Sequence, residues 1–166
     1  MKSKNNKRTI KDRRQYTLEV FIISGPVTKK FSKKNLAISR TIQIRGDQTL
    51  EDLHETIFDA FNRYDEHMYE FQMDGNGPMD PEAKKYTLPM AMEGPFGDDQ
   101  AGDVTRTNIG SLELKVNESF GYWFDFGDDW WHQINVVAID NESSGKYPRI
   151  VKRRGESPPQ YPHIEE

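Results

Sequence analysis

Apolar and polar residues alternate most regularly in residues 120–139. In the first part of this stretch, aromatic residues occupy every second position: Phe120, Tyr122, Phe124 and Phe126. This period is typical of a strand with one aromatic face. Gly127, Asp128 and Asp129 then supply turn chemistry, and residues 130–139 resume a β-rich pattern. The pattern predicts a β-hairpin with a buried aromatic face and an acidic tip that lies outside.

Two more strand patterns come earlier in the chain. In residues 16–23 both alternating sets are mostly apolar, which favours a central strand. Residues 37–44 carry isoleucines on one face: Ile38, Ile42 and Ile44. Arg40 interrupts this face, and we expect its charge to lie near the margin of the sheet. The polar residues 29–35 between the two strands are expected to form a loop.

One segment has the signature of an amphipathic helix. Thr49 and Asp52 form a capping-box pattern. Apolar residues follow at helical spacing: Leu50, Leu53, Ile57, Phe58 and Phe61. We expect this helix to end near Tyr64 and to lay its apolar stripe across the sheet.

The middle of the chain has weaker signals. Residues 67–72 predict another strand, with His67 at its start. Residues 74–110 are rich in glycine, proline and acidic residues, and they form either a partly helical segment around residues 82–86 or a mobile flap. Alternation resumes in residues 111–116, where three apolar side chains are expected to point inward: Leu112, Leu114 and Val116.

The length and composition of the chain agree with one folded domain. The 166 residues are only 34% hydrophobic, but nine Phe, seven Tyr and three Trp supply large areas for burial. Residues 147–152 predict a last short strand. The patterns together predict a single α+β domain over residues 15–162, with a largely antiparallel sheet, an amphipathic helix packed across one face and a long irregular insertion.

The net charge of -4 is unevenly distributed. Residues 1–14 contain seven Lys and Arg against one Asp, so we expect a basic flexible tail, which is either a nucleic-acid-binding arm or a frayed terminus. A second basic cluster lies in residues 146–154. Nucleic acid is therefore a candidate partner. The candidate contacts are Arg13, Arg14, Arg149, Lys152, Arg153 and Arg154.

The sequence contains no cysteine, which excludes disulfides and thiolate metal sites and agrees with a reducing compartment. No apolar run reaches membrane-spanning length, and the basic N-terminus lacks the apolar stretch of a signal peptide. We therefore expect a cytoplasmic protein that makes no use of a membrane.

The acidic tip of the hairpin is the candidate site for chemistry. Its members are Asp125, Asp128, Asp129 and His132, with His67 brought in by the fold. Carboxylates suit hard divalent cations and imidazole suits transition metals, so the set could hold a divalent cation as a cofactor. In the structural alternative, the aspartates bond to their own backbone amides and Trp130 and Trp131 anchor the hairpin. Nucleotide-binding, nucleophile-elbow and zinc-protease motifs are absent from the sequence.

Residues 122–132 resemble the Y-x-Y-D-F-G-D-x-W-x-H signature of the plasmid pRiA4b ORF-3-like family. Residues 49–57 resemble its t-L-x-d-L-H-x-x-I pattern, and residues 67–71 its H-L-x-x-F segment. The resemblance implies an α+β fold and relatives encoded beside plasmid and insertion-sequence genes, without a settled biochemical activity. Many relatives carry cysteine and a Pro-Pro-Glu-Asp continuation, whereas this chain has Gln160-Tyr161-Pro162 and no cysteine.

Two functions of different classes follow from these observations. The first is a binding or accessory module linked to nucleic-acid or mobile-element biology, with the basic clusters and a groove beside the aromatic hairpin as its surface. The alternative is a metal-dependent hydrolase or nuclease that uses the acidic hairpin tip.

Overall fold

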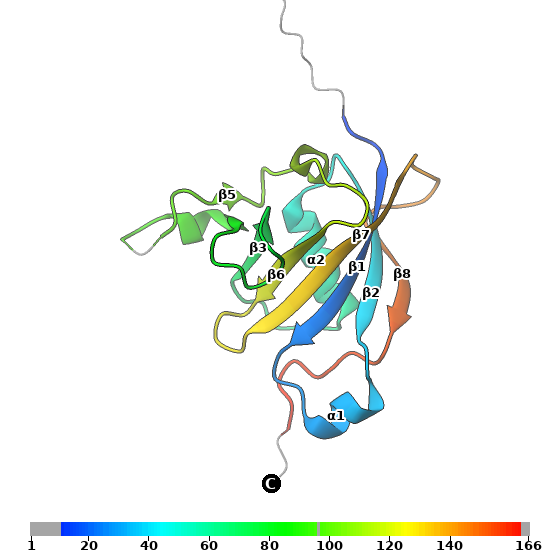
Figure 1. Ribbon diagram of the computed structural model, residues 1–166, viewed down its shortest axis with the longest axis vertical. Helices are drawn as coiled ribbons and strands as arrows, with labels where there is room; N and C mark the ends of the chain where they lie inside the picture. The colour runs from blue at the N-terminus through cyan, green and yellow to red at the C-terminus, as the bar shows by residue number, and fades with distance from the viewer. Residues whose placement is uncertain (1–10, 96, 164–166) are drawn as a thin grey trace, which may run out of the picture.

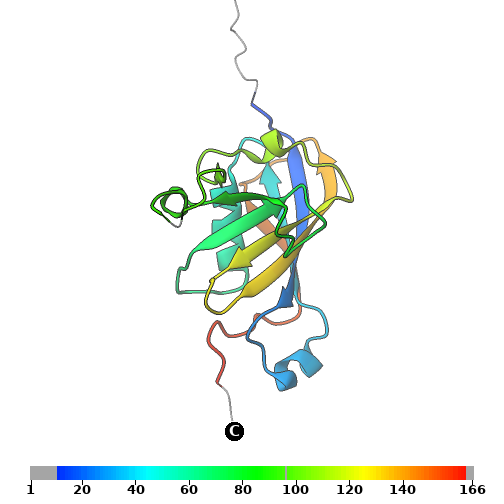
Figure 2. The same ribbon diagram turned by 60° about the vertical axis from the view of Figure 1, so that its left-hand side comes forward.

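Eight strands form one sheet in the order β5-β4-β3-β6-β7-β1-β2-β8 (Figures 1 and 2). All neighbouring pairs are antiparallel except β4 and β5, which are parallel. The computed structural model describes residues 11–95 and 97–163. Most of the predicted basic tail, residues 1–10, lies outside the described residues. Within the described ranges, no helix has both the length and the apolar character needed to cross a membrane.

The centre of the sheet agrees with the predicted strands. β1 (Gln15–Ser24) pairs on one side with β2 (Ser39–Arg45) and on the other with β7 (Trp130–Asp140). The prediction of a central strand is therefore confirmed. β6 (Ser119–Phe124) and β7 form the predicted aromatic hairpin. The prediction is wrong for Phe126, which follows the left-handed Asp125 and is exposed rather than part of the buried aromatic face. β8 (Arg149–Arg154) pairs with β2 and forms one edge of the sheet.

The opposite edge comes from the middle of the chain. β3 (Tyr69–Met73) pairs with β6 and with β4 (Lys84–Thr87), and the short β5 (Gly102–Asp103) follows β4. The prediction of a helix around residues 82–86 is therefore wrong, since β4 occupies most of this segment. The strand predicted over residues 111–116 is also wrong.

The helices begin at side-chain caps. α2 (Leu50–Ala60) has the predicted capping box, in which the Asp52 amide donates to the Thr49 hydroxyl at 3.1 Å and the Asp52 carboxylate accepts from the Thr49 amide at 2.9 Å. The helix ends before Tyr64, because Asn62 takes the left-handed conformation with φ 57°. α1 (Lys29–Lys34), capped by Thr28, occupies a segment that we expected to be a loop. Two 3₁₀ turns follow: η2 (Pro89–Met92) lies in the insertion and η3 (Ile109–Leu112) lies at its end.

The core lies between α2 and one face of the sheet. Three residues of the helix stripe are fully buried: Leu50, Leu53 and Ile57. They pack against the inward set of β1 and β2, which includes Leu18 and Ile42. Figure 1 shows α2 behind β6 and β7. We call the opposite face of β6, β7, β1, β2 and β8 the open face.

Arg40 is buried rather than placed at the margin of the sheet. Only 2% of the residue is exposed. Its guanidinium donates to the carbonyl of Ala60 at the end of α2 (2.9 Å), to the carbonyl of Gly155 (3.1 Å) and to the hydroxyl of Ser157 (2.8 Å). Arg40 therefore joins β2, the end of α2 and the chain that follows β8.

Candidate functional site

The turn of the aromatic hairpin is held by Asp125. This residue is 5% exposed and has φ 67°. One oxygen of its carboxylate accepts from the amides of Gly127 at 3.0 Å and Asp128 at 3.1 Å. An aspartate that accepts from amides two and three residues later is a common way to close a turn. Asp125 therefore has a structural role in the hairpin, whatever else it does.

The other acidic residues of the tip lie outside the core. Asp128 and Asp129 are exposed, and Asp129 accepts a hydrogen bond from the indole of Trp123 at 2.9 Å. The structure does bring His67 to the tip, with its Nε2 atom 3.4 Å from the Asp125 carboxylate. The same nitrogen lies 2.7 Å from the hydroxyl of Tyr161.

His132 is directed away from the tip. It is fully buried, its Nδ1 lies 3.1 Å from the carbonyl of Tyr122, and its Nε2 lies 2.9 Å from the guanidinium of Arg63. Burial, and then the charge of Arg63, lowers the pKa of His132 well below its usual value. An unprotonated Nε2 can accept from Arg63, so its lone pair is already used. Within residues 11–95 and 97–163, no group of three or more acidic or histidine side chains is arranged to hold a metal ion.

Arg63 is an internal residue that sequence reasoning did not single out. Its guanidinium lies 5.0 Å from the ring centroids of both Phe124 and Trp130. Burial lowers the pKa of Arg63 to about 10. No sequence pattern indicates that Arg63 is buried, because it lies after the apolar stripe of the predicted helix and outside every predicted strand.

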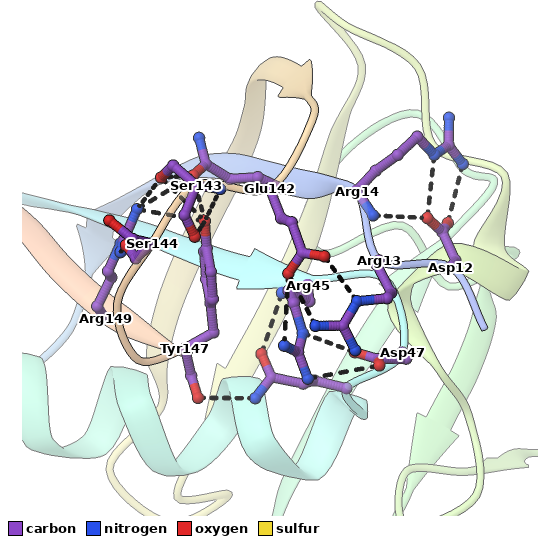
Figure 3. Close-up of polar contacts among 12 residues, drawn as sticks. Asp12, Arg13, Arg14, Arg45, Asp47, Glu142, Ser143, Ser144, Tyr147 and Arg149 are labelled. Carbon is purple, nitrogen blue, oxygen red and sulfur yellow. Dashed lines mark hydrogen bonds and ion pairs between the residues drawn. The ribbon is translucent and has the colours of Figure 1, made fainter.

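Three of the candidate nucleic-acid contacts are engaged within the chain (Figure 3). Arg13 donates to Glu142 at 2.6 Å, and Arg14 donates to Asp12 at 2.9 Å. Arg149 donates to the carbonyl of Ser144 at 2.7 Å. These arginines therefore fix the turn after β7 and the start of β1. Carboxylates partly balance the charges of Arg13 and Arg14, and a backbone carbonyl holds the guanidinium of Arg149.

The other three candidates lie exposed on β8. Lys152 is opposite Thr41 and Arg154 is opposite Ser39, while Arg153 is opposite the buried Arg40. Because successive side chains of a strand point to opposite faces, Lys152 and Arg154 belong to the open face and Arg153 to the α2 side.

Polar and aromatic residues continue across the open face from β8. Ser39 is opposite Phe21 on β1, which is opposite Gln133 on β7. In the neighbouring row, Glu19 is opposite Asn135. These β1 and β7 side chains are partly exposed.

Two tryptophans form the far end of the open face. Trp123 and Trp131 are opposite each other in the hairpin, and their rings are stacked with centroids 4.7 Å apart and an angle of 4°. The ring of Phe126 lies 4.2 Å from that of Trp123. Both tryptophans are partly exposed, whereas Trp130 is fully buried. The stack comes from cross-strand register, which the sequence pattern alone did not reveal.

A groove runs along the end of β1 beside this face. Its volume is about 780 Å³. It is lined partly by residues of the open face, including Phe21, Gln133 and Asn135, and partly by residues after α1, including Leu36. Leu36 is 92% exposed. The open face therefore combines stacked rings, amides, a groove with a mixed polar and apolar lining, and a basic edge.

These features define a small α+β protein built on a single sheet, with a helix on one face and an aromatic and polar surface on the other. The sequence model of the family described as plasmid pRiA4b ORF-3-like protein matches residues 28–161. The chain belongs to this family. The resemblance read from the hairpin signature is thereby confirmed.

Two similar proteins carry no assigned function. An uncharacterized protein, y4hQ, of Sinorhizobium fredii (strain NBRC 101917 / NGR234) is 26% identical over 123 residues, which are 74% of this chain and 58% of that protein. The crystal structure of a protein of unknown function, MM3350 of Methanosarcina mazei Go1, matches with a TM-score of 0.64 and 24% identity over 87% of this chain and 71% of that one. This second likeness concerns the fold alone.

Proposed function

We propose that the protein is an accessory module that binds single-stranded nucleic acid on its open face. The stacked pair of Trp123 and Trp131 carries this proposal. Proteins that bind single strands without strong sequence preference use partly exposed aromatic rings on which bases stack, beside a positively charged track for the backbone. A base can extend a stack of rings that the hairpin has already formed.

The rest of the face supports the same ligand. The amides of Gln133 and Asn135 can bond to base edges, and they already lie within 2.9 Å of each other. Lys152 and Arg154 on β8 can neutralise phosphates. Asp128 and Asp129 at the tip would repel phosphates. We therefore place the bases over the tryptophans and the backbone on the side of β8.

Two observations limit the expected affinity. Glu19 lies in the middle of the open face, where it accepts a hydrogen bond from Ser39 at 3.1 Å. The whole chain has a net charge of -4. Binding should therefore be moderate and should weaken strongly with salt.

The test is the fluorescence anisotropy of a labelled oligodeoxythymidine at low and physiological salt, with the same strand in a duplex as a competitor. Trp131→Ala should weaken binding about tenfold or more, since one stacked base contributes about 1–3 kcal/mol. Val137→Ala is the matched control, because Val137 is an exposed residue of the same strand. Replacing both Lys152 and Arg154 by glutamine should reduce the salt dependence by about 0.7 per lost contact.

Two results would contradict the proposal. The first is the absence of salt-sensitive binding at low ionic strength. The second is an affinity of Trp131→Ala that equals the affinity of Val137→Ala. If the protein prefers the duplex to the single strand, the binding site would be the basic edge at β8 and not the tryptophans.

The alternative, a metal-dependent hydrolase or nuclease, is supported by one observation, the approach of His67 to Asp125 at 3.4 Å. A cation there would have to displace the hydrogen bond between His67 and Tyr161. Calorimetry with magnesium, manganese and zinc on the parent protein and on His67→Ala tests it. Heats that are absent, or equal in the two proteins, would exclude this pair as the site.

A further inference from the structure

A second concave site lies on the α2 side of the sheet, away from the open face. It is a shallow pocket of about 530 Å³ between α2 and the start of β3. The lining residues are Glu51, His54, Glu55, Glu66, His67, Met68, Tyr69 and Leu88. The proposed nucleic-acid surface includes none of them.

His54 is fixed at the floor of this pocket. Only 2% of the residue is exposed. Its Nδ1 lies 2.6 Å from the hydroxyl of Tyr122 and its Nε2 lies 3.0 Å from the carboxylate of Glu66. An imidazole with its proton on Nε2 satisfies both contacts, because Tyr122 then donates to Nδ1 while Nε2 donates to Glu66. This arrangement holds the Glu66 carboxylate at the rim of the pocket.

The charges that line the pocket are acidic. Three of the lining residues are glutamates, and none is lysine or arginine. Burial raises the pKa of Glu55, and the nearby carboxylates of Glu51 and Asp52 raise it further. The carboxylates around Glu55 therefore repel one another, and a bound cation would relieve this repulsion. The hydrogen bond to His54 lowers the pKa of Glu66, so this carboxylate is ready to meet a cation in its charged form.

An unpartnered hydroxyl gives a second and independent indication of a ligand. Tyr69 is one of the residues that line the pocket, and its ring stacks on His54 with centroids 3.6 Å apart and an angle of 3°. Tyr69 is 2% exposed, and its hydroxyl has no hydrogen-bond partner among the described residues. Burial raises the pKa of Tyr69, followed by the carboxylates of Glu51, Glu66 and Glu55. Buried polar groups are normally paired, so an unpaired one beside a pocket calls for a partner.

We propose that this pocket binds a small organic cation with a primary ammonium group. An ammonium group has three donors and no acceptor, which matches a site made of carboxylates and a phenol oxygen. The described residues contain no cluster of three or more side chains arranged for a metal ion, so an organic cation fits better than a divalent metal. Glu66, which His54 positions, would be the main charged contact of the ammonium group. The hydroxyl of Tyr69 would gain the hydrogen-bond partner that it lacks among the described residues.

The experiment is isothermal titration of the full chain at low salt with 1,4-diaminobutane. Magnesium chloride and the neutral analogue 1,4-butanediol are the controls for charge and for shape. We expect the diamine to bind and the diol to give no heat. Glu55→Gln combined with Glu66→Gln should weaken the diamine at least tenfold. Glu82→Gln, an exposed glutamate outside the pocket, should bind like the parent.

Tyr69→Phe separates a ligand contact from a packing role. Removal of an unpaired buried hydroxyl should leave the thermal midpoint of the free protein equal or higher, while the affinity for the diamine falls. A variant that binds the diamine as well as the parent would overturn the role of Tyr69. Two results would overturn the site itself. One is that the double glutamine variant binds the diamine as tightly as the parent, and the other is that magnesium gives binding heats equal to those of the diamine. Trp131→Ala should bind the diamine normally, so this result is independent of the nucleic-acid proposal.

Discussion

Two adjacent tryptophans have opposite environments in this protein. Trp130 is fully buried, and the guanidinium of Arg63 lies 5.0 Å from its ring. Trp131 lies on the open face. Trp130→Ala should lower the free energy of unfolding by about 3–5 kcal/mol, because it leaves a large cavity. Trp131→Ala should cost about 1 kcal/mol, the contribution of an aromatic pair near the surface.

Urea unfolding of both variants checks this difference. A loss for Trp131→Ala as large as that for Trp130→Ala would show that the stacked pair is part of the core. The binding test with Trp131→Ala would then need to be read together with its stability.

The buried imidazole of His132 makes stability depend on pH. Its pKa is lowered well below the usual value by burial, whereas in the unfolded chain it titrates near pH 6.5. Below that pH the unfolded state binds a proton that the folded state does not, so stability is complete above pH 6.5 and falls as the pH decreases. The thermal midpoint should therefore decrease between about pH 7.5 and pH 5.5.

His132→Gln should flatten this profile, although it should also lower the midpoint at every pH. Burial raises the pKa of Glu70, which acts in the opposite direction at lower pH, so the difference between variant and parent isolates the histidine. His163→Gln, which alters an exposed histidine, is the control. Parallel profiles of His132→Gln and the parent would exclude the buried imidazole as the cause.

At the scale of elements, the hairpin turn depends on one acceptor. Asp125→Ala removes the partner of the Gly127 and Asp128 amides and should cost about 1 kcal/mol or more. Asp125→Asn keeps an acceptor oxygen and tolerates the positive φ, so it should cost less. Asp128→Asn, at an exposed position, should cost at most about 1 kcal/mol. Thermal midpoints with chelator and with manganese compare the three variants.

A gain in stability for Asp128→Asn would point to repulsion among carboxylates at the tip and would favour the metal alternative. A loss of stability for Asp128→Asn equal to that for Asp125→Ala would show that Asp125 is not the main acceptor of the turn.

The elements with strong local signals could be predicted, and those that depend on tertiary contacts could not. β1, the hairpin and α2 follow from period and capping. Residues 111–116 alternate, but Glu113 takes a left-handed conformation with φ 55° and breaks the strand. α1 has one apolar residue, Phe31, and a helix so short is stable only when it packs against the rest of the fold.

The candidate site was predicted only in part. His67 does lie beside Asp125, which the sequence pattern suggested without fixing the distance. His132 is in the same alternating set as Trp130 and Ile134, and this set faces the core. That parity could have separated His132 from the tip. The unpaired Tyr69 and the stack of Trp123 on Trp131 depend on register between distant segments, for which the sequence has no signal.

For the whole molecule, the distribution of charge matters more than its sum. The insertion and the hairpin tip are acidic, whereas α1 and β8 are basic, and these parts lie around one sheet (Figure 1). A chain with a net charge of -4 can therefore still present a basic edge to a polyanion.

The basic edge strand also has a consequence for self-association. β8 has backbone groups without a neighbouring strand on its outer side, since it ends the sheet, and its Val151 is 49% exposed. Unprotected edges invite a second copy to add its own strand, and positive charges along the edge prevent this by repulsion. Replacement of Lys152, Arg153 and Arg154 by serine should therefore produce concentration-dependent oligomers in light scattering, while the parent stays monodisperse under the same conditions. The cations that would attract a polyanion thus also keep copies of the chain apart.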